Sequence, residues 1–181
     1  MATLKGRRLE LRPLAETDAE ALFSAIEASR DSLRRRMRWV GKVASAEDCR
    51  AFIQASRQEA ERGASQVYGV FETKTGALAG IVALQHLLVI PGLAEAAAWI
   101  RADRQDKGYA LEAGKLLLGL AFKGDHLHRV YARIDPANRA GRKVLQRLGF
   151  HYEGCLRQEK RLNSRWINQE CWGLLRSEHK K

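Results

Sequence analysis

A glycine-containing turn between an apolar strand and an amphipathic helix constrains the fold of this chain more than any other segment. Residues 93–101 predict the strand, which contains Trp99-Ile100 at its end, and residues 111–122 predict the helix. The turn has the sequence Arg-Gln-Asp-Lys-Gly-Tyr-Ala, residues 104–110. The first N–H groups of such a helix lack acceptors, and its dipole adds about half a positive charge there. Because Gly108 has no Cβ, a phosphate can approach the backbone closely, so the turn is a candidate anion cradle.

The remaining pattern predicts a mixed α/β or α+β fold in a single domain, residues 1–181. Strands are expected at residues 9–13, 66–72, 77–88 and 129–135, with a last pair that begins at Gly149-Phe150 and ends near residue 175. Turns at residues 73–76 and 91–92 join three strands in an antiparallel meander. Helices are expected from Thr17 or Asp18 through Ile26, from Ser45 with an apolar face that reaches Ala60, and at residues 139–148. No internal repeat or linker divides the sequence.

The charge of the chain indicates an anionic partner without identifying it. The net charge is +11, and residues 139–181 hold eleven basic and four acidic residues, a net charge of +7. Such a field attracts nucleic acid or a phosphate-rich cofactor, and it also occurs on solvated surfaces that keep a protein soluble. The apolar stretches are too short to span a bilayer, and the N-terminus lacks the apolar region of a secretory signal. A cytoplasmic location without membrane contact is therefore expected.

The spacing of cysteines and histidines gives no reason to expect a disulfide or a metal. Cys49, Cys155 and Cys171 include no C-x-x-C pair and are expected to be free thiols. His126 and His128 lie two residues apart, but no third and fourth ligand accompanies them.

The strands at residues 93–101 and 130–135 would flank the helix that follows the cradle. If these strands separate, their free backbone groups form a slot for an extended amide chain such as pantetheine, which can pair like an additional strand. An anion cradle at the mouth of that slot suits a long phosphate-bearing cofactor.

Further motifs surround this unit at specific spacing. They are Leu9-x-Leu11-Arg12-Pro13-Leu14, Glu112 early in the helix, Phe122 before His128-Arg129-Val130, then Asn138, Leu148-Gly149-Phe150 and Glu153-Gly154. Together with the cradle, they resemble the GCN5-related N-acetyltransferase (GNAT) superfamily. They are most similar to its branch that acetylates the N-termini of ribosomal proteins (RimJ/RimL-like). The resemblance spans essentially all 181 residues. It implies a single-domain GNAT fold with a mixed, mostly antiparallel sheet of about seven strands, flanking helices and splayed central strands.

The resemblance also implies an activity and a cosubstrate. An acetyl group would pass from acetyl-CoA to a primary amine, with a protein N-terminal α-amine as the favoured acceptor. The backbone of residues 104–109 would bind the pyrophosphate, and the Asn138 side chain would bind pantetheine. A backbone N–H from residues 99–101 would stabilise the oxyanion, an effect of about 10²–10³ in rate. The implied cofactor-binding residues are Trp99, Ile100, Arg101, Arg104, Gln105, Asp106, Lys107, Gly108, Tyr109, Ala110 and Asn138.

Glu95 is the candidate catalytic base. Only a neutral amine attacks, and a carboxylate can take its proton through water. Glu95 stands in the otherwise apolar stretch 93–99, where an unpaired carboxylate is costly, and its position is similar to that of a Glu in many relatives. A Glu95 that faces solvent or pairs with an arginine is the alternative reading. Glu159 is a second candidate base.

The chain departs from the family pattern at positions where relatives carry functional groups. Gly141 and Leu145 replace residues that often bear a hydroxyl, and Lys160 stands where close relatives can carry Glu. The thiolate of CoA can leave without a dedicated acid, because its pKa is near that of an ordinary thiol. These departures bear on the residue-level mechanism more than on the reaction class, and they leave a non-catalytic acyl-CoA binder open.

The acceptor is the least specified part of the prediction. Residues 30–38 contain five arginines in nine positions and predict a basic amphipathic turn or short helix. Arg34, Arg38 and Trp39 are the candidate substrate-binding residues. A basic rim would repel a polyamine and suit an acidic peptide, a phosphorylated substrate or nearby rRNA, although a solvated arginine face is equally consistent. A small-molecule amine acceptor, a non-catalytic RNA-binding module near the ribosome, and a monomer or homodimer all stay open.

Overall fold

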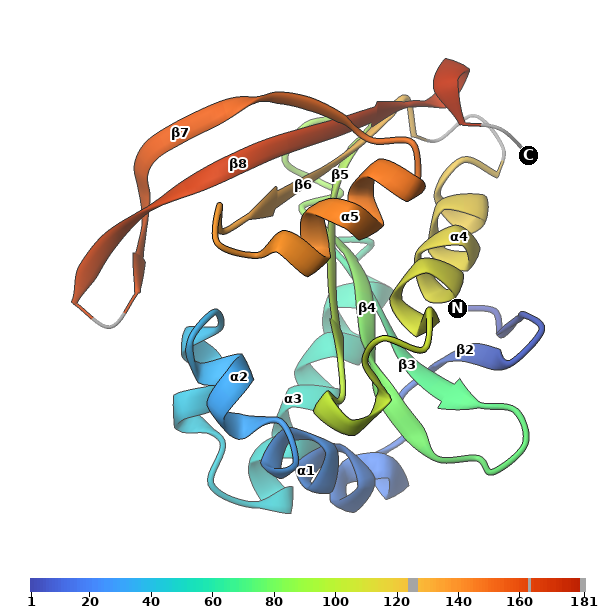
Figure 1. The fold of residues 1–181 in the computed structure, drawn as a ribbon. Helices are drawn as coiled ribbons and strands as arrows, with labels where there is room; N and C mark the ends of the chain where they lie inside the picture. The colour runs from blue at the N-terminus through green and yellow to red at the C-terminus, as the bar shows by residue number, and fades with distance from the viewer. Residues whose placement is uncertain (124–126, 163, 180–181) are drawn as a thin grey trace.

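The protein forms a twisted sheet with helices on both faces (Figure 1). The computed structural model describes residues 1–123, 127–162 and 164–179, except for the Arg38 side chain. The strands are β1 (Leu4–Lys5), β2 (Leu9–Pro13), β3 (Gln66–Glu72), β4 (Leu78–Gln85), β5 (Leu93–Ile100), β6 (Arg129–Ile134), β7 (His151–Leu162) and β8 (Arg165–Leu175). The helices are α1 (Ala19–Glu27), α2 (Arg30–Arg34), α3 (Ala46–Glu61), α4 (Tyr109–Ala121) and α5 (Arg139–Arg147), with short 3-10 turns η1 (Glu16–Asp18), η2 (Arg38–Lys42), η3 (Ala102–Arg104) and η4 (Arg176–Glu178).

Strand periodicity builds one hydrophobic core on each face of the sheet. Tyr68 and Val70 of β3 pack in a core with α4 and α5, whereas Val67 and Phe71 of the same strand pack in a second core with α1, α2 and α3. Successive side chains of a strand point to opposite faces, so one apolar strand serves both cores. The segments that form the cradle and the predicted acceptor region therefore belong to different layers.

Local sequence determines where the long helix α3 begins. Ser45 Oγ accepts a hydrogen bond from the Asp48 N–H at 3.3 Å, and the Asp48 carboxylate accepts one from the Ser45 N–H at 2.9 Å. This reciprocal capping box satisfies two backbone donors that the helix itself leaves without partners. The buried face of α3 includes Cys49 and Ile53, as the sequence predicts.

The sheet order β1-β2-β3-β4-β5-β6-β8-β7 contains one parallel neighbour pair, β5 and β6. These two strands pair through only three residue positions, Leu93 with Arg129, Ala94 with Val130 and Glu95 with Tyr131. Beyond Glu95 the rest of β5 pairs with β4 alone. The predicted splaying of the central strands is thus present, and it begins immediately after Glu95.

The last two strands form a long hairpin that extends beyond the body of the sheet (Figure 1). Most residues of β7 are exposed, but Leu162 near the tip is buried. Lys160 Nζ donates a hydrogen bond to the Arg36 carbonyl oxygen at 3.0 Å, which joins the tip to the segment after α2. The hairpin tip therefore contacts the layer of α1–α3.

The observed fold confirms the predicted mixed, mostly antiparallel sheet with flanking helices and splayed central strands, with two differences in detail. The short strand β1 was not expected, and it brings the sheet to eight strands. The strand predicted over residues 77–88 ends at Gln85, because His86 has a left-handed φ of 60° and interrupts the extended backbone. The cysteines are free thiols, as predicted. Among the described residues, no helix is long and apolar enough to cross a membrane.

A partly buried ion pair joins β2 to the start of α1. Arg12 Nη1 and Nη2 donate to the two Asp18 carboxylate oxygens at 2.7 and 2.8 Å, and the Ala15 N–H donates to the same carboxylate at 2.8 Å. Burial alone would raise the pKa of Asp18, but these hydrogen bonds and the charge of Arg12 bring the pKa below its usual value.

We expect Asp18→Asn to lower the free energy of unfolding by about 1–3 kcal/mol at pH 7, because it leaves the half-buried Arg12 guanidinium without its charged partner. The lowered pKa stabilises the fold above the unfolded-state pKa of about 3.9 and ceases to do so as the pH falls through the folded-state value. The difference between the two proteins should therefore shrink at pH 3. Urea unfolding at pH 7 and pH 3 measures this difference in the free energy of unfolding, and Asp31→Asn, at an exposed position, is the control. A difference that is as large at pH 3 as at pH 7 contradicts the stabilising role of the Asp18 carboxylate.

Candidate active site

A cavity of about 580 Å³ occupies the opening where β5 and β6 separate. Its walls come from residues 96–100 of β5, Ala132 and Ile134 of β6, the first turns of α4, and α5. At one end it reaches Leu33 of α2, together with Arg36 and Met37, which follow that helix. The cavity therefore runs from the cradle, through the gap in the sheet, to the layer of α1–α3.

The backbone of the cradle has the geometry of an anion site. Asp106 and Gly108 are left-handed, with φ values of 58° and 76°. Gly108 is the N-cap of α4 and, having no side chain, makes no side-chain cap hydrogen bond with the first turn of that helix. The N–H groups at the helix start are thus available to a phosphate, and the helix dipole favours its charge. A pyrophosphate fits this donor set.

Glu112 of α4 and Arg8 connect the cradle to the start of β2. The Glu112 carboxylate accepts hydrogen bonds from the Arg8 N–H at 2.7 Å, the Leu9 N–H at 3.2 Å and Arg8 Nε at 2.9 Å. Burial would raise the pKa of Glu112, but these bonds and the Arg8 charge lower it. Arg8 Nη1 also donates to the Lys107 carbonyl oxygen at 2.8 Å, and the guanidinium carbon lies 5.1 Å from the centre of the Tyr109 ring. Arg8 thus fixes the two residues that flank Gly108.

A second carboxylate, Glu72 at the end of β3, fixes the opposite side of the cradle. Tyr109 Oη donates to Glu72 Oε1 at 2.9 Å, and Arg104 Nε lies 2.9 Å from the same oxygen. The hydrogen bond to Glu72 raises the pKa of Tyr109, so the phenol remains a donor at neutral pH. Arg104 lies at the cavity wall, and the carboxylates of Glu72 and Asp103 hold its guanidinium in place.

Asn138 caps α5 and lines the cavity. Its Oδ1 accepts a hydrogen bond from the Gly141 N–H at 3.1 Å, which leaves its amide N–H₂ group as the donor for a ligand. A Cβ on residue 141 would approach Asn138 Nδ2 to 2.6 Å. Gly141 thus makes room for Asn138 at the position where relatives often carry a hydroxyl-bearing residue. Leu145 also lines the cavity and is buried.

Glu95 lies in a cluster of polar side chains where the strands part. Glu95 Oε2 is 3.2 Å from His86 Nδ1 and 3.7 Å from Arg133 Nη2, and the Glu95 side chain is 17% exposed. Tyr131 Oη lies 3.4 Å from the same His86 nitrogen. Arg133 Nη1 pairs in addition with Glu159 Oε1 at 2.9 Å. Both candidate bases therefore contact one arginine, and Glu95 is the more enclosed of the two.

The structure places most of the predicted cofactor residues around the cavity, but neither of the described acceptor candidates, Arg34 and Trp39. Trp99, Ile100, Arg104, Gln105, Asp106, Gly108, Tyr109, Ala110 and Asn138 all line the cavity. Arg101 and Lys107 lie beside it and are not among the lining residues. Trp39 stacks on Phe52 with parallel rings 5.8 Å apart, and the exposed Arg34 lies away from the cavity wall, which Arg36 contacts instead. The Arg38 side chain lies outside the described residues, as does His126.

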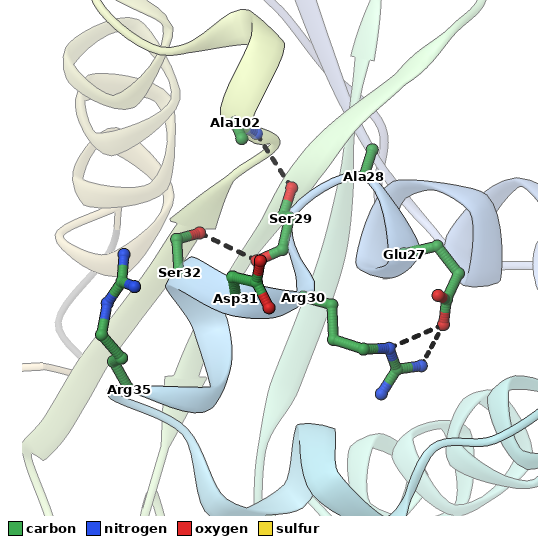
Figure 2. Close-up of a pocket in the computed structure, with 8 residues that line it drawn as sticks. All are labelled: Glu27, Ala28, Ser29, Arg30, Asp31, Ser32, Arg35 and Ala102. Carbon is green, nitrogen blue, oxygen red and sulfur yellow. Dashed lines mark hydrogen bonds and ion pairs between the residues drawn. The ribbon is translucent and has the colours of Figure 1, made fainter.

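A second hollow, of about 430 Å³, lies between the α1–α2 turn and η3 (Figure 2). Ser29 Oγ accepts a hydrogen bond from the Ala102 N–H at 2.9 Å, and Ser32 Oγ donates to the Ser29 carbonyl oxygen at 2.8 Å. The first of these bonds connects the α1–α2 turn to Ala102, which follows β5 and Arg101. The described residues contain no group of three or more His, Cys, Asp or Glu side chains placed to hold a metal.

Comparison with known proteins agrees with this geometry. Residues 8–151 match the family model described as an acetyltransferase (GNAT) domain. A ribosomal-protein-serine acetyltransferase of Escherichia coli K12 is 27% identical over 155 residues, which cover 86% of each chain. The structure of Mycobacterium smegmatis RimJ in complex with CoA-disulfide is similar with a TM-score of 0.91 and 22% identity, over 99% of this chain and 90% of the other. A spermidine N(1)-acetyltransferase of Escherichia coli K12 is 31% identical over 93 residues, about half of each chain.

The cradle geometry predicts that Gly108→Ala weakens acetyl-CoA binding at least tenfold. An alanine with left-handed φ costs about 1–2 kcal/mol, and its Cβ would lie 3.4 Å from Arg8 Nη2, the side chain that holds the turn beside the anion site. Gly63→Ala is the matched control, because Gly63 has a φ of 72° and a Cβ there would contact nothing within 4 Å. Calorimetry with acetyl-CoA should separate the two variants, whereas their thermal stabilities should fall alike. Equal acetyl-CoA affinities in the two variants contradict the assignment of the cradle.

Proposed function

Because the chain belongs to the GNAT acetyltransferase family, acetyl transfer from acetyl-CoA to an amine is its activity, and we propose that the amine is the α-amino group of a protein N-terminus. The observation that carries the proposal is the continuous cavity from the cradle, through the gap between β5 and β6, to the layer of α1–α3. A cosubstrate enters such a cavity from one end and an acceptor from the other. We also propose that residues 1–181 act as one domain and that the enzyme works in the cytoplasm, where ribosomal acceptors are found.

The cofactor half of the cavity provides for each part of acetyl-CoA. The N–H groups at the start of α4 would bind the pyrophosphate, and the Asn138 amide would donate to an oxygen of pantetheine. The edge of β5 beyond Glu95 faces the gap without a strand partner on that side. An extended pantetheine chain would pair there as a strand does, with its thioester directed toward the point where the strands part.

The reaction requires a neutral amine and a stabilised oxyanion. The amine nitrogen attacks the acetyl carbonyl carbon, a C–N bond forms, and the carbonyl electron pair moves onto oxygen. A backbone N–H of residues 99–101 would stabilise that oxygen. Glu95 would take the proton of the amine through water, and collapse of the tetrahedral intermediate would break the C–S bond and release the CoA thiolate. His86, which is half exposed and contacts Glu95, offers a path for that proton to solvent.

A protein N-terminus is favoured over a small amine because the far end of the cavity is open between two exposed segments. Arg36 and Met37 follow α2 on one side, and the tip of the β7–β8 hairpin lies on the other. The relative that acts on a ribosomal protein also covers 86% of this chain, whereas the spermidine enzyme covers 51%. Spermidine N(1)-acetyltransferase nevertheless supports a small-molecule amine as the second candidate acceptor.

Glu95→Gln should reduce kcat/KM for a peptide acceptor by about 10²-fold or more, because the glutamine amide cannot take the proton of the amine. Acetyl-CoA affinity should stay within about twofold, since Glu95 is not among the residues that line the cavity. Thiol release in the presence of N-terminal peptides measures kcat/KM, and calorimetry measures the affinity for acetyl-CoA.

Glu159→Gln is the matched control for this experiment, because Glu159 contacts the same arginine and is the other candidate base. It should keep most of the wild-type rate. The opposite order of effects would assign the base to Glu159, and full activity in both variants would mean that neither carboxylate is the base.

A further inference from the structure

We propose that the acceptor of this enzyme carries acidic side chains close behind its amino group, and that a basic rim at the far end of the cavity binds them. The basic rim consists of Arg36, which lines the cavity, and of Arg34, Arg35, Lys160 and Arg165, which lie on the two segments that meet beside it. The inference extends the proposed function, because it specifies which class of protein N-terminus the enzyme takes.

The rim is assembled from two segments that lie far apart in the sequence. Arg34 ends α2, and Arg35 and Arg36 follow it with exposed side chains. The hydrogen bond from Lys160 Nζ to the Arg36 carbonyl oxygen brings the hairpin tip to this segment. Because Leu162 pairs directly with Arg165 across the hairpin, Arg165 lies on the same face as Leu162 and Lys160. The two segments that meet at this end of the cavity thus carry five basic residues, of which Arg36 lines the cavity itself.

Few negative charges compensate this rim. Within the described part of the chain, Arg34, Arg35 and Arg36 form no ion pair with a carboxylate. Asp31 on α2 is exposed, and Glu159 next to Lys160 is already paired with Arg133. Concentrated charge of one sign at the mouth of a cavity focuses the electrostatic potential there and attracts a ligand of opposite charge.

The phosphates of acetyl-CoA do not account for the rim. The cradle end of the same cavity has its own basic residues, Arg104, Arg139, Lys143 and Arg147. The rim lies at the other end, next to Leu33 and Met37, in the layer of α1–α3. An acceptor chain whose amine reaches the gap between β5 and β6 must pass the rim within its first few residues. An acidic peptide fits this compact geometry better than RNA, which is bound by longer basic grooves that follow the backbone.

The same electrostatics select against cationic acceptors. A polyamine would bring further positive charge to a surface that already carries five basic groups. The rim therefore distinguishes this chain from an enzyme for spermidine, although a spermidine acetyltransferase is among its relatives.

The test compares peptides that share their first two residues and differ at residues three to six, which are acidic, glutamine or lysine. At about 10–20 mM salt, kcat/KM for the acidic peptide should exceed that for the lysine peptide about tenfold or more, and the ratio should fall at about 0.3 M salt. Arg36→Glu should reduce the preference for the acidic peptide and raise the rate with the lysine peptide. A gain with one substrate cannot result from misfolding. Lys115→Glu on α4 makes the same change in net charge on the other layer and should leave the preference unchanged.

A binding measurement keeps the inference separate from the proposed function. Fluorescence anisotropy with N-acetylated, labelled versions of the same peptides needs no turnover, and the acidic peptide should bind wild type at least tenfold tighter than Arg36→Glu. If no peptide is acetylated but this difference remains, the proposed acceptor is wrong and the rim still stands as an anion site. Equal binding and equal rates with the acidic and lysine peptides contradict the proposal that the rim binds acidic side chains. The inference is also overturned if a single-stranded RNA binds wild type more tightly than Arg36→Glu while none of the peptides does. The basic residues would then form a nucleic-acid surface.

Discussion

The short pairing of β5 with β6 is the constraint on which the site depends. Two parallel strands that share only three paired positions leave the rest of β5 with an open edge inside the molecule. Buried backbone groups without partners are costly, so a fold keeps such an edge only when water or a ligand can satisfy it. The same separation creates the cavity, and Glu95 stands at the last paired position, where the strands part.

The cradle depends on contacts with segments far from it in the sequence. Gly108 and Asp106 adopt backbone angles that local sequence alone does not hold. Arg8 and Glu112 fix one side from the start of β2, and Glu72 fixes the other through Tyr109 and Arg104. The site is thereby organised before acetyl-CoA arrives, which lowers the entropy that binding must overcome.

Local patterns predicted the elements well, because each has a local physical cause. The capping box at Ser45, the alternation in residues 66–72 and the glycine turn before α4 each depend on neighbours within a few residues. The strand at 77–88 was predicted three residues too long, because its apolar pattern continues past His86, where the backbone becomes left-handed. The contacts of Arg8 gave no local signal, because Arg8 and Glu112 are 104 residues apart. Arg36 contacts the cavity, whereas Arg34 and Trp39 do not. The sequence did not distinguish these residues, because a helix of only five residues gives too short a pattern to show which side chains face the cavity.

The sequence by itself determined the family, the order of the elements and the glycine turn that suits a phosphate, because periodicity, capping and backbone freedom act over short distances. It also identified an excess of positive charge, but not where that charge gathers. Only the tertiary structure decided that β5 and β6 part after Glu95, that His86, Tyr131 and Arg133 surround that carboxylate, and that the β7–β8 tip meets the segment after α2. These features depend on the packing of segments distant in the sequence, and no local pattern specifies how such segments meet.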